Sequence, residues 1–388
     1  MNVQHKFTDQ YEYPTAWSGW GDEEHYAINR VIASDKYTTG IECESLEREF
    51  ADYHGMRFGI GVNSGSSANL VSLAAMAERG LFNRGDRVLV PALAWATTYS
   101  PLIQYGLDPA LIDADASWCA ARDSDLQHTY KLGNADRVGL IVDCPILGNP
   151  SHGAFWKQMA DNLGCPLLSD TCESIGAREP DGTRCGTRGL ANTFSFYFSH
   201  QLSAIEGGMI LTNDEDFAIM CRRIRNHGWS RGTKMAQRFE DEFEFVVPGY
   251  NVRPLELHSA IARVQLGKLD ARIKARRENW DHFFHIADDL PIRLPRETAP
   301  MISPFCLHFA VADSEMRQRL ANALRANNID CRPPIAGSFR LQPYGKRWAS
   351  QRTPVADGIH QRGIALGCPP FDGRNLIDKA VKVMREVL

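Results

Sequence analysis

Four groups of residues in this 388-residue chain have the types and order needed for chemistry on a small anionic molecule. The first, residues 63–69 (NSGSSAN), comes just before a predicted helix. Small residues at a helix start let backbone N–H groups and hydroxyls converge on an anion at the positive end of the helix dipole. No Gly-Lys-Ser/Thr follows, so the group is not a Walker loop. Taken alone, it is equally consistent with an ordinary helix cap.

The second group is acidic and follows a predicted buried strand. Asp170 and Glu173 lie in residues 169–174 (SDTCES). The carboxyl end of an internal strand is where open α/β sheets bind ligands. A carboxylate buried there is costly unless a cation pairs with it, and a protonated pyridine nitrogen is one such cation. The alternative is an aspartate that caps the next helix.

The other two groups supply an aromatic ring and a base. Trp95, in residues 91–98 (PALAWATT), could stack on a planar ligand or fill the core. His200 follows a predicted strand that carries Ser195, and an imidazole exchanges protons near neutral pH, although a lone histidine is often structural. Together the four groups supply an anion cradle, a ring platform, an acid and a proton-transfer group, which are the parts of a pyridoxal phosphate site.

These groups need a sheet whose strands end at one edge. The predicted strands are mostly continuous apolar runs, which is typical of strands covered on both faces of a mainly parallel sheet. They are residues 87–93, 139–145, 166–170, 192–198 and 209–213. Residues 66–77 and 255–284 have apolar side chains at helical spacing. The sequence therefore predicts an α/β fold.

Beyond about residue 290 the composition changes. Prolines cluster at 291, 295, 300 and 304, before a predicted strand at 307–311, a helix at 314–327 and the segment 329–334. We therefore expect a large cofactor-binding domain over residues 1–290, with its N-terminal segment, and a small α+β domain over residues 291–388.

Composition narrows the class of protein. Hydrophobic residues make up 44% and charged residues 23%, which is ordinary for a globular chain. A net charge of −4 gives no basic footprint for nucleic acid, and no apolar run reaches the ~20 residues of a membrane span. Without a secretory signal at its start, we expect a cytoplasmic protein. The ten cysteines form no C-x-C or C-x-x-C pair, so we expect buried thiols and no metal site.

The order of six segments resembles the DegT/DnrJ/EryC1/StrS sugar aminotransferase/dehydratase family of pyridoxal phosphate (PLP) enzymes. The segments are SGSSAN, PALAWATTYSP, SDTCESIGA, SFYFSHQLSAIEGG, HGWSR and PGYNVRP. The resemblance runs from about Tyr13 to the C-terminus. It implies the aspartate aminotransferase-like fold (fold type I) and a homodimer with shared active sites.

Position 200 departs from the aminotransferases of this family. They place there, five residues after the Ser of S-F-x-x-x, the lysine that bonds to the cofactor, whereas this chain has His200. Imidazole cannot form that imine, so PLP or pyridoxamine phosphate (PMP) would be held non-covalently, while His200 could still move a proton. This pattern resembles the branch that removes the C3 hydroxyl from nucleotide-linked 4-keto-6-deoxyhexoses, with GDP-4-keto-6-deoxymannose as the implied substrate.

A related branch carries the same histidine but needs an iron–sulfur cluster, whose cysteines should lie between the histidine and the Gly-Tyr-Asn motif. This chain has only Cys221 between His200 and Asn251, so no cluster is expected. The resemblance implies that glutamate converts PLP to PMP and that the sugar reaction releases ammonia. Two alternatives are a sugar aminotransferase that tolerates histidine and a PLP-binding regulator without activity.

The resemblance also implies a role for each site residue. Asp170 would pair with the pyridine nitrogen, Trp95 would stack on the ring, and Glu173 would contact the ring hydroxyl or support Asp170. His200 would be the base. Four residues would hold the phosphate, the last from the partner subunit: Gly65, Ser66, Ser195 and Asn251. Two would bind a carboxylate of glutamate: Ser199 and Arg253.

Overall fold

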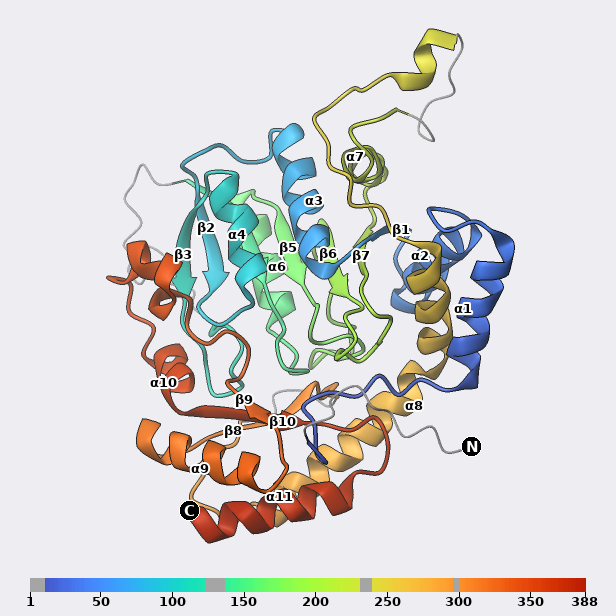
Figure 1. The fold of residues 1–388 in the computed structure, drawn as a ribbon. Helices are drawn as coiled ribbons and strands as arrows, with labels where there is room; N and C mark the ends of the chain where they lie inside the picture. Colours follow the sequence, from blue (N-terminus) through green and yellow to red (C-terminus); the bar gives the residue numbers. More distant parts are fainter. Residues whose placement is uncertain (1–10, 123–136, 231–238, 296–300) are drawn as a thin grey trace.

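The computed structural model describes residues 11–122, 137–230, 239–295 and 301–388, which form a large sheet flanked by helices and a smaller sheet near the C-terminus (Figure 1). The large sheet has seven strands in the order β1-β7-β6-β5-β4-β2-β3, and β7 runs in the direction opposite to the other six. Its strands are β1 (Phe58–Val62), β2 (Arg87–Pro91), β3 (Asp108–Ile112), β4 (Val138–Asp143), β5 (Leu167–Asp170), β6 (Ala191–Ser195) and β7 (Gly208–Thr212). The predicted α/β fold with a mainly parallel sheet is confirmed.

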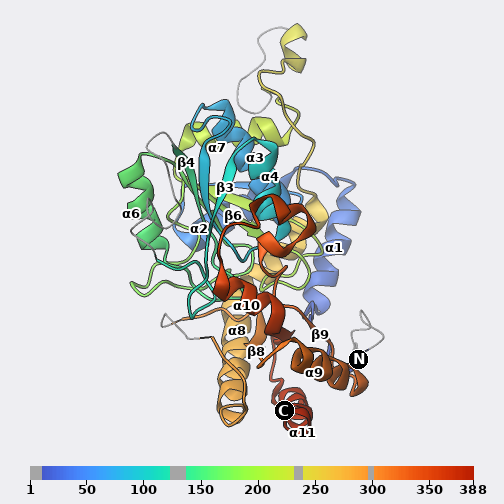
Figure 2. The same cartoon turned by 90° about the vertical axis from the view of Figure 1, so that its left-hand side faces the viewer.

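Helices cover both faces of this sheet because its strands are apolar on both sides. Two successive residues of β4 show the division: Leu140 packs in the same cluster as helices α3, α4 and α7, whereas Ile141 packs with α6. Figure 2 shows α6 on the opposite side of the sheet from α3 and α4. The helices are α3 (Gly65–Glu78), α4 (Ala96–Gln104), α6 (Gly153–Leu163) and α7 (Glu215–Arg225).

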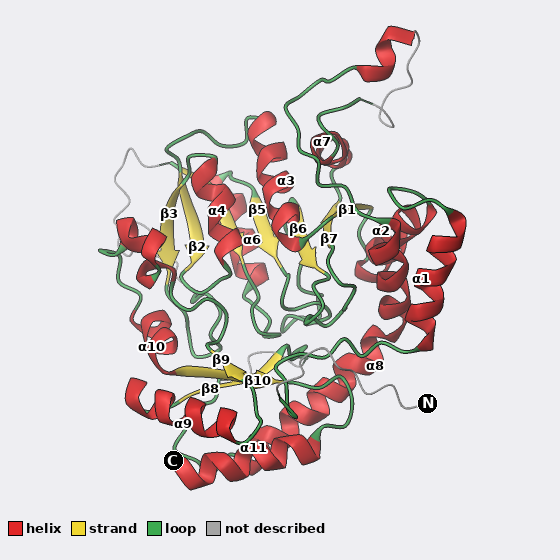
Figure 3. Ribbon diagram, in the orientation of Figure 1, coloured by secondary structure: helices red, strands yellow, loops and turns green. Residues whose placement is uncertain are grey.

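The C-terminal part has its own antiparallel sheet, in the order β8-β10-β9, with helices packed against it (Figure 3). Its elements are β8 (Cys306–Ala310), α9 (Ser314–Ala326), β9 (Cys331–Arg332), α10 (Pro354–Arg362), β10 (Gly363–Gly367) and α11 (Arg374–Val387), with the 3₁₀ turns η2 (Phe339–Leu341) and η3 (Pro343–Trp348). Tyr13 and Trp280 pack into the same apolar core, so the N-terminal segment and α8 both support this part. The division at residue 290 stays a prediction.

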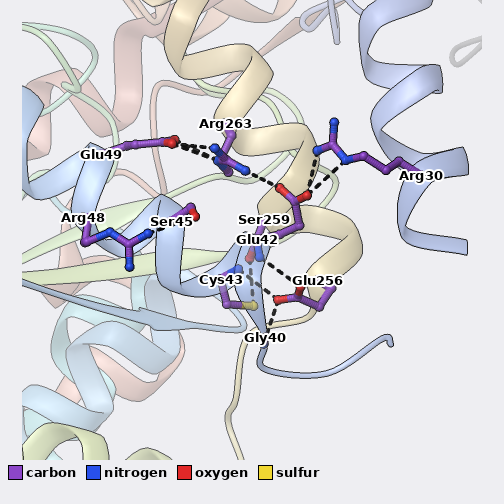
Figure 4. Close-up of polar contacts among 10 residues, drawn as sticks. All are labelled: Arg30, Gly40, Glu42, Cys43, Ser45, Arg48, Glu49, Glu256, Ser259 and Arg263. Carbon is purple, nitrogen blue, oxygen red and sulfur yellow. Dashed lines mark hydrogen bonds and ion pairs between the residues drawn. The ribbon is translucent and has the colours of Figure 1, made fainter. Parts of the chain in front are cut away.

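The long helix α8 (Glu256–Ile286) connects the two parts and packs against α1 (Asp22–Ser34) and α2 (Ile41–His54). Glu256, in the first turn of α8, accepts hydrogen bonds from the backbone N–H groups of Gly40, Glu42 and Cys43, at 2.8–2.9 Å (Figure 4). A side chain from another helix therefore satisfies the free N–H groups at the start of α2. Between α7 and α8, a segment with the 3₁₀ turn η1 (Phe239–Phe243) extends from the body of the molecule (Figure 1).

Candidate active site

A cavity of about 440 Å³ lies at the carboxyl ends of the parallel strands, between the large sheet and the small one. In Figure 1 the arrowheads of these strands point toward the small sheet. The segments that follow β1, β2, β4, β5 and β6 all contribute lining residues, and Phe305 and Arg332 close the cavity from the small sheet. All four groups of residues that the sequence analysis singled out contribute to the lining of this one cavity.

The predicted anion cradle forms where α3 begins. Ser64 caps the helix by accepting a hydrogen bond from the Ser67 N–H at 3.1 Å, and Ser66 Oγ lies 2.7 Å from Thr97 Oγ1. A Cβ at Gly65 would lie 2.6 Å from the Cβ of Ser195, so only glycine lets the helix start approach the end of β6 this closely. Gly65, Ser66 and Ser195 therefore meet in the cavity wall, where N–H groups and hydroxyls suit a phosphate.

Asp170, which is 4% exposed, ends β5 and faces the cavity. Its Oδ2 accepts hydrogen bonds from Asn69 Nδ2 at 2.8 Å and Thr98 Oγ1 at 2.7 Å, and Thr193 in turn donates to Asn69 Oδ1 at 2.7 Å. Within the described ranges these partners are all neutral, and no Lys, Arg or His forms an ion pair with Asp170. A carboxylate held rigidly without a cation suits a protonated pyridine nitrogen. Sequence reasoning assigned no role to Asn69 and Thr98, although both lie in the quoted motifs.

Trp95 lies at the cap of α4 and lines the same cavity. Its side chain is 55% exposed, which rules out the core-filling role that was the alternative from sequence. An indole that keeps a free face beside an open cavity is suited to stack on a planar ring.

His200 lies in the cavity wall, against the ring of Phe305 at a centroid distance of 5.2 Å. Its Nδ1 is 3.3 Å from the Ser195 carbonyl oxygen, which can only accept, so Nδ1 carries the proton and Nε2 is left with a free lone pair. Burial lowers the pKa of His200 to about 4, and the charge of Arg332 acts in the same direction. The imidazole is therefore neutral at pH 7 and able to accept a proton.

Glu173 lines the cavity, and its Oε2 accepts a hydrogen bond from the Leu147 N–H at 3.1 Å. Burial raises the pKa of this carboxyl to about 7, although the Leu147 N–H and the charge of Arg332 act the other way. The described contacts include no direct hydrogen bond between Glu173 and Asp170. The two carboxyl groups therefore influence each other only through electrostatic interaction.

The remaining predicted residues separate into two places. Ser199 is buried in the cavity wall beside His200. Asn251 and Arg253 lie outside this cavity, where Arg253 Nε donates to Asn251 Oδ1 at 3.1 Å. Asn251 is exposed, and its predicted contribution to a second copy stays a prediction. Arg332, a cavity residue, had no distinguishing signal in the sequence.

The cavity residues fit a phosphorylated pyridine: a cradle for the phosphate, an indole for the ring face and a carboxylate for the ring nitrogen. Across the described parts of the chain, no three His, Cys, Asp or Glu side chains are grouped to hold a metal ion, and no helix is long and apolar enough to span a membrane.

A mainly parallel sheet with this cavity at its strand ends, closed by a small C-terminal sheet, defines the aminotransferase-like class of PLP-dependent enzymes. More narrowly, the chain belongs to the DegT/DnrJ/EryC1/StrS aminotransferase family, whose model matches residues 20–385. The resemblance inferred from the motifs is confirmed.

Relatives of known activity point to one branch of this family. The GDP-4-keto-6-deoxy-D-mannose 3-dehydratase of Yersinia pseudotuberculosis is 37% identical over 340 residues, which cover 84% of this chain and 85% of the relative. The solved E. coli GDP-4-keto-6-deoxy-D-mannose-3-dehydratase with bound hydrated PLP matches with a TM-score of 0.88 and 32% identity, covering 97% of this chain and 100% of that one. A GDP-4-keto-6-deoxymannose-3-dehydratase with a trapped PLP-glutamate geminal diamine gives the same score and identity over 96% of this chain and all of the other.

Proposed function

We propose that this protein is a PLP- and glutamate-dependent 3-dehydratase that removes the C3 hydroxyl of a nucleotide-linked 4-keto-6-deoxyhexose, with GDP-4-keto-6-deoxymannose as the expected substrate. The observation that carries the proposal is His200, a neutral imidazole in the cofactor cavity at the position where aminotransferases of the family have lysine. The named 3-dehydratases that this chain resembles over most of its length support the same reaction.

The cavity residues divide the work of holding PLP or PMP without a covalent bond. Gly65, Ser66 and Ser195 bind the phosphate, Trp95 covers one face of the ring, and Asp170 holds the proton on the ring nitrogen. When bound, the cofactor supplies an amino group and an electron sink for the substrate carbons. Asp170 keeps that sink effective because its carboxylate, fixed by Asn69 and Thr98, stabilises the protonated pyridine.

His200 moves the proton. With PLP or PMP held in the cavity, its free Nε2 would serve as the base that takes a proton from C4′, the carbon next to the reacting nitrogen, while the Ser195 carbonyl holds Nδ1–H in place. Since no lysine is available at this position to displace the product, loss of the C3 hydroxyl and hydrolysis complete the reaction. Overall, glutamate and the 4-keto sugar give 2-oxoglutarate, ammonia and the 3,6-dideoxy-4-keto sugar, so each turnover consumes one glutamate.

The active form is proposed to be a homodimer. The segment between α7 and α8 carries three strongly exposed aromatic residues, Phe239, Phe243 and Phe245. Exposed aromatic groups of this kind are typical of protein contacts, and the exposed Asn251 follows on the same segment, available to a second copy. We expect a solution mass, measured by light scattering, of twice the 43.4 kDa of one chain. Because all ten cysteines are free thiols, we place the enzyme in the reducing cytoplasm.

The deciding experiment incubates the protein with PLP, glutamate and a panel of nucleotide-linked 4-keto-6-deoxyhexoses. We expect 2-oxoglutarate and ammonia in equal amounts, with GDP-4-keto-6-deoxymannose as the best substrate and a deoxygenated keto sugar as product. A stable 4-amino sugar formed without ammonia would instead identify an aminotransferase. Binding of PLP without any glutamate-dependent product would identify a regulator.

A further inference from the structure

Gln201, the residue after His200, has a buried side chain that contacts two other segments of the chain. It is 2% exposed. Its Nε2 donates to the backbone carbonyl oxygen of Glu173 at 2.6 Å and to that of Ser303 at 2.9 Å. A carbonyl oxygen can only accept a hydrogen bond, so the amide nitrogen, which carries two N–H groups, must face this pair. Both donors of the Gln201 side chain are therefore used.

Each of the three segments that this amide joins contributes a residue to the lining of the cavity. His200 directly precedes Gln201 in the chain. Glu173 supplies one of the accepting carbonyl groups, and Phe305 lies two residues after Ser303, which supplies the other. The His200 ring packs against the Phe305 ring at a centroid distance of 5.2 Å. One nitrogen atom therefore ties the backbone of the proposed base to the segment that carries its aromatic neighbour.

The segment at Ser303 is fixed by contacts of its own, so it can serve as an anchor. Ser303 is fully buried, its Oγ donates to the Ile175 carbonyl oxygen at 2.6 Å, and its N–H donates to the Gly148 carbonyl oxygen at 2.9 Å. Gly148 has a φ of +87°, and a Cβ there would overlap the Ser303 carbonyl group, so this close approach requires glycine.

The imidazole of His200 is held less firmly by its own contacts. Among the described residues it makes one hydrogen bond, from Nδ1 to the Ser195 carbonyl oxygen, and its length of 3.3 Å is well above the usual 2.9–3.0 Å. The position of the ring therefore depends on where the backbone at residues 200 and 201 is held.

We propose that Gln201 is a positioning residue for proton transfer by His200, an inference that rests on the proposed function. By donating to two carbonyl groups at once, Gln201 sets the distance between the His200 backbone and the anchored segment at Ser303. Gln201 does not line the cavity, so it acts through His200 and not on the cofactor or substrate. Since a displacement of about 1 Å can cost about 100-fold in rate, loss of this amide should slow proton transfer and leave binding unchanged.

The chain offers a matched control in Asn279 of α8. Its Nδ2 also donates to two backbone carbonyl oxygens, those of Pro369 at 2.9 Å and Phe371 at 2.7 Å, and the residue is 1% exposed. These three residues lie outside the cavity lining. Gln201→Met and Asn279→Leu therefore remove the same type of contact, in one case beside the proposed base and in the other away from it.

The first measurement follows, by absorbance and without any sugar, the conversion of the PLP-loaded protein by glutamate. In Gln201→Met the maximal rate should fall about 10- to 100-fold, while the half-saturating concentration of glutamate stays near the wild-type value. Gln201→Asn keeps an amide on a shorter side chain, and its loss should be smaller. Asn279→Leu should keep the wild-type rate, even where its melting temperature falls as far.

Three results would overturn the positioning role. They are a wild-type maximal rate in Gln201→Met, an equal loss of rate in Asn279→Leu, and a rise in half-saturating glutamate at an unchanged maximal rate. Should Gln201→Met not fold, a wild-type rate in Gln201→Asn would overturn it in the same way.

A second measurement needs neither cofactor nor sugar. In the full-length protein without cofactor, labelled with ¹³C at histidine, NMR follows the titration of His200, whose signal is assigned with His200→Asn. Burial lowers the pKa of His200 to about 4 in the wild type. In Gln201→Met water should reach the loosened ring and the pKa should rise toward the ordinary 6.5, whereas Asn279→Leu should leave it unchanged.

The titration separates this inference from the dehydratase proposal. A His200 pKa that rises in Gln201→Met and stays in Asn279→Leu supports the positioning role even if the wild-type protein dehydrates no sugar. The same pKa in the wild type and in Gln201→Met would contradict the positioning role even if the dehydratase activity is found.

Discussion

Two polar regions of the molecule differ in how their charged groups are partnered. Between α1, α2 and α8, Glu42 accepts hydrogen bonds from both Arg30 and Arg263 at 2.7 Å, and Glu256 accepts three backbone N–H groups (Figure 4). Arg263 also binds Glu49. Each of these charges is matched by a group of the chain itself, so the region needs no ligand to be complete.

The cavity shows the opposite pattern. Asp170 is held only by neutral donors, and Arg332 meets no acceptor among the residues that the structure describes. Both groups sit beside Glu173, a carboxyl whose pKa burial raises to about 7. Matched charges stabilise the fold, whereas charges left unmatched at a cavity mark where a charged ligand supplies the partner.

Among the substitutions that test this comparison, the largest effect is expected at His200, in the cavity. His200→Lys replaces the imidazole by a primary amine that can bond to the cofactor and displace the product, so dehydration should fall about 100- to 10,000-fold. Borohydride treatment should leave PLP covalently attached to this variant and not to the wild type, as mass spectrometry would show. His285→Lys, which adds an exposed lysine at the end of α8, is the control and should gain no attachment. Unchanged dehydration in His200→Lys would refute the role of His200.

Replacing a glutamate by glutamine should change the free energy of unfolding in opposite directions in the two regions. Glu256→Gln should lower the free energy of unfolding by about 2–4 kcal/mol at pH 7, since three N–H groups, two of them in buried hydrogen bonds, lose their charged acceptor. Although burial alone raises the pKa of Glu256, the Cys43, Glu42 and Gly40 contacts lower it below its ordinary 4.5. This stabilisation is therefore present above pH 4.5 and is lost as the pH falls through the lowered value. Urea unfolding from pH 3 to 8 measures it, and a pH-independent difference would contradict it.

Glu173→Gln should instead stabilise the protein without cofactor, by about 1–3 kcal/mol at pH 8. The raised pKa means that the folded state keeps a proton between pH 4.5 and 7 that the unfolded chain releases, so stability falls as the pH rises through this window. Glutamine removes that cost and can still accept from the Leu147 N–H. Thermal unfolding of both proteins at pH 5 and 8 is the measurement. A loss of stability at pH 8 would show that the carboxylate is satisfied in the folded protein.

Only part of the fold could be predicted from the sequence, because some strands lack a recognisable local pattern. Continuous apolar runs revealed β2, β4, β5, β6 and β7 because strands covered on both faces have that composition. Short apolar runs that contain or are bounded by glycine or proline, such as β1 (FGIGV), β3 (DPALI) and β10 (GIALG), were missed.

Within the site, the motifs located Gly65, Asp170 and His200 because local spacing defines them. They gave no signal for Arg332, whose place in the cavity depends on the pairing of β9 with β10. Nor could they reveal the cap that Glu256 provides for α2, since more than 200 residues separate donor and acceptor. Local sequence motifs do not encode contacts between residues that are far apart in the chain.

The smallest expected effect on stability comes from removing one of the two arginines that pair with Glu42. The Arg30 side chain is 46% exposed, and Glu42 keeps Arg263 when Arg30 is removed, so Arg30→Gln should cost about 0.5 kcal/mol or less. Arg263→Gln should cost more, because it leaves both Glu49 and half of Glu42 without a partner. The double variant should lose more than the sum of the two, since the buried Glu42 then has no cation at all. Urea unfolding of the three variants gives this coupling, and strictly additive losses would mean that the network contributes pair by pair and not as a unit.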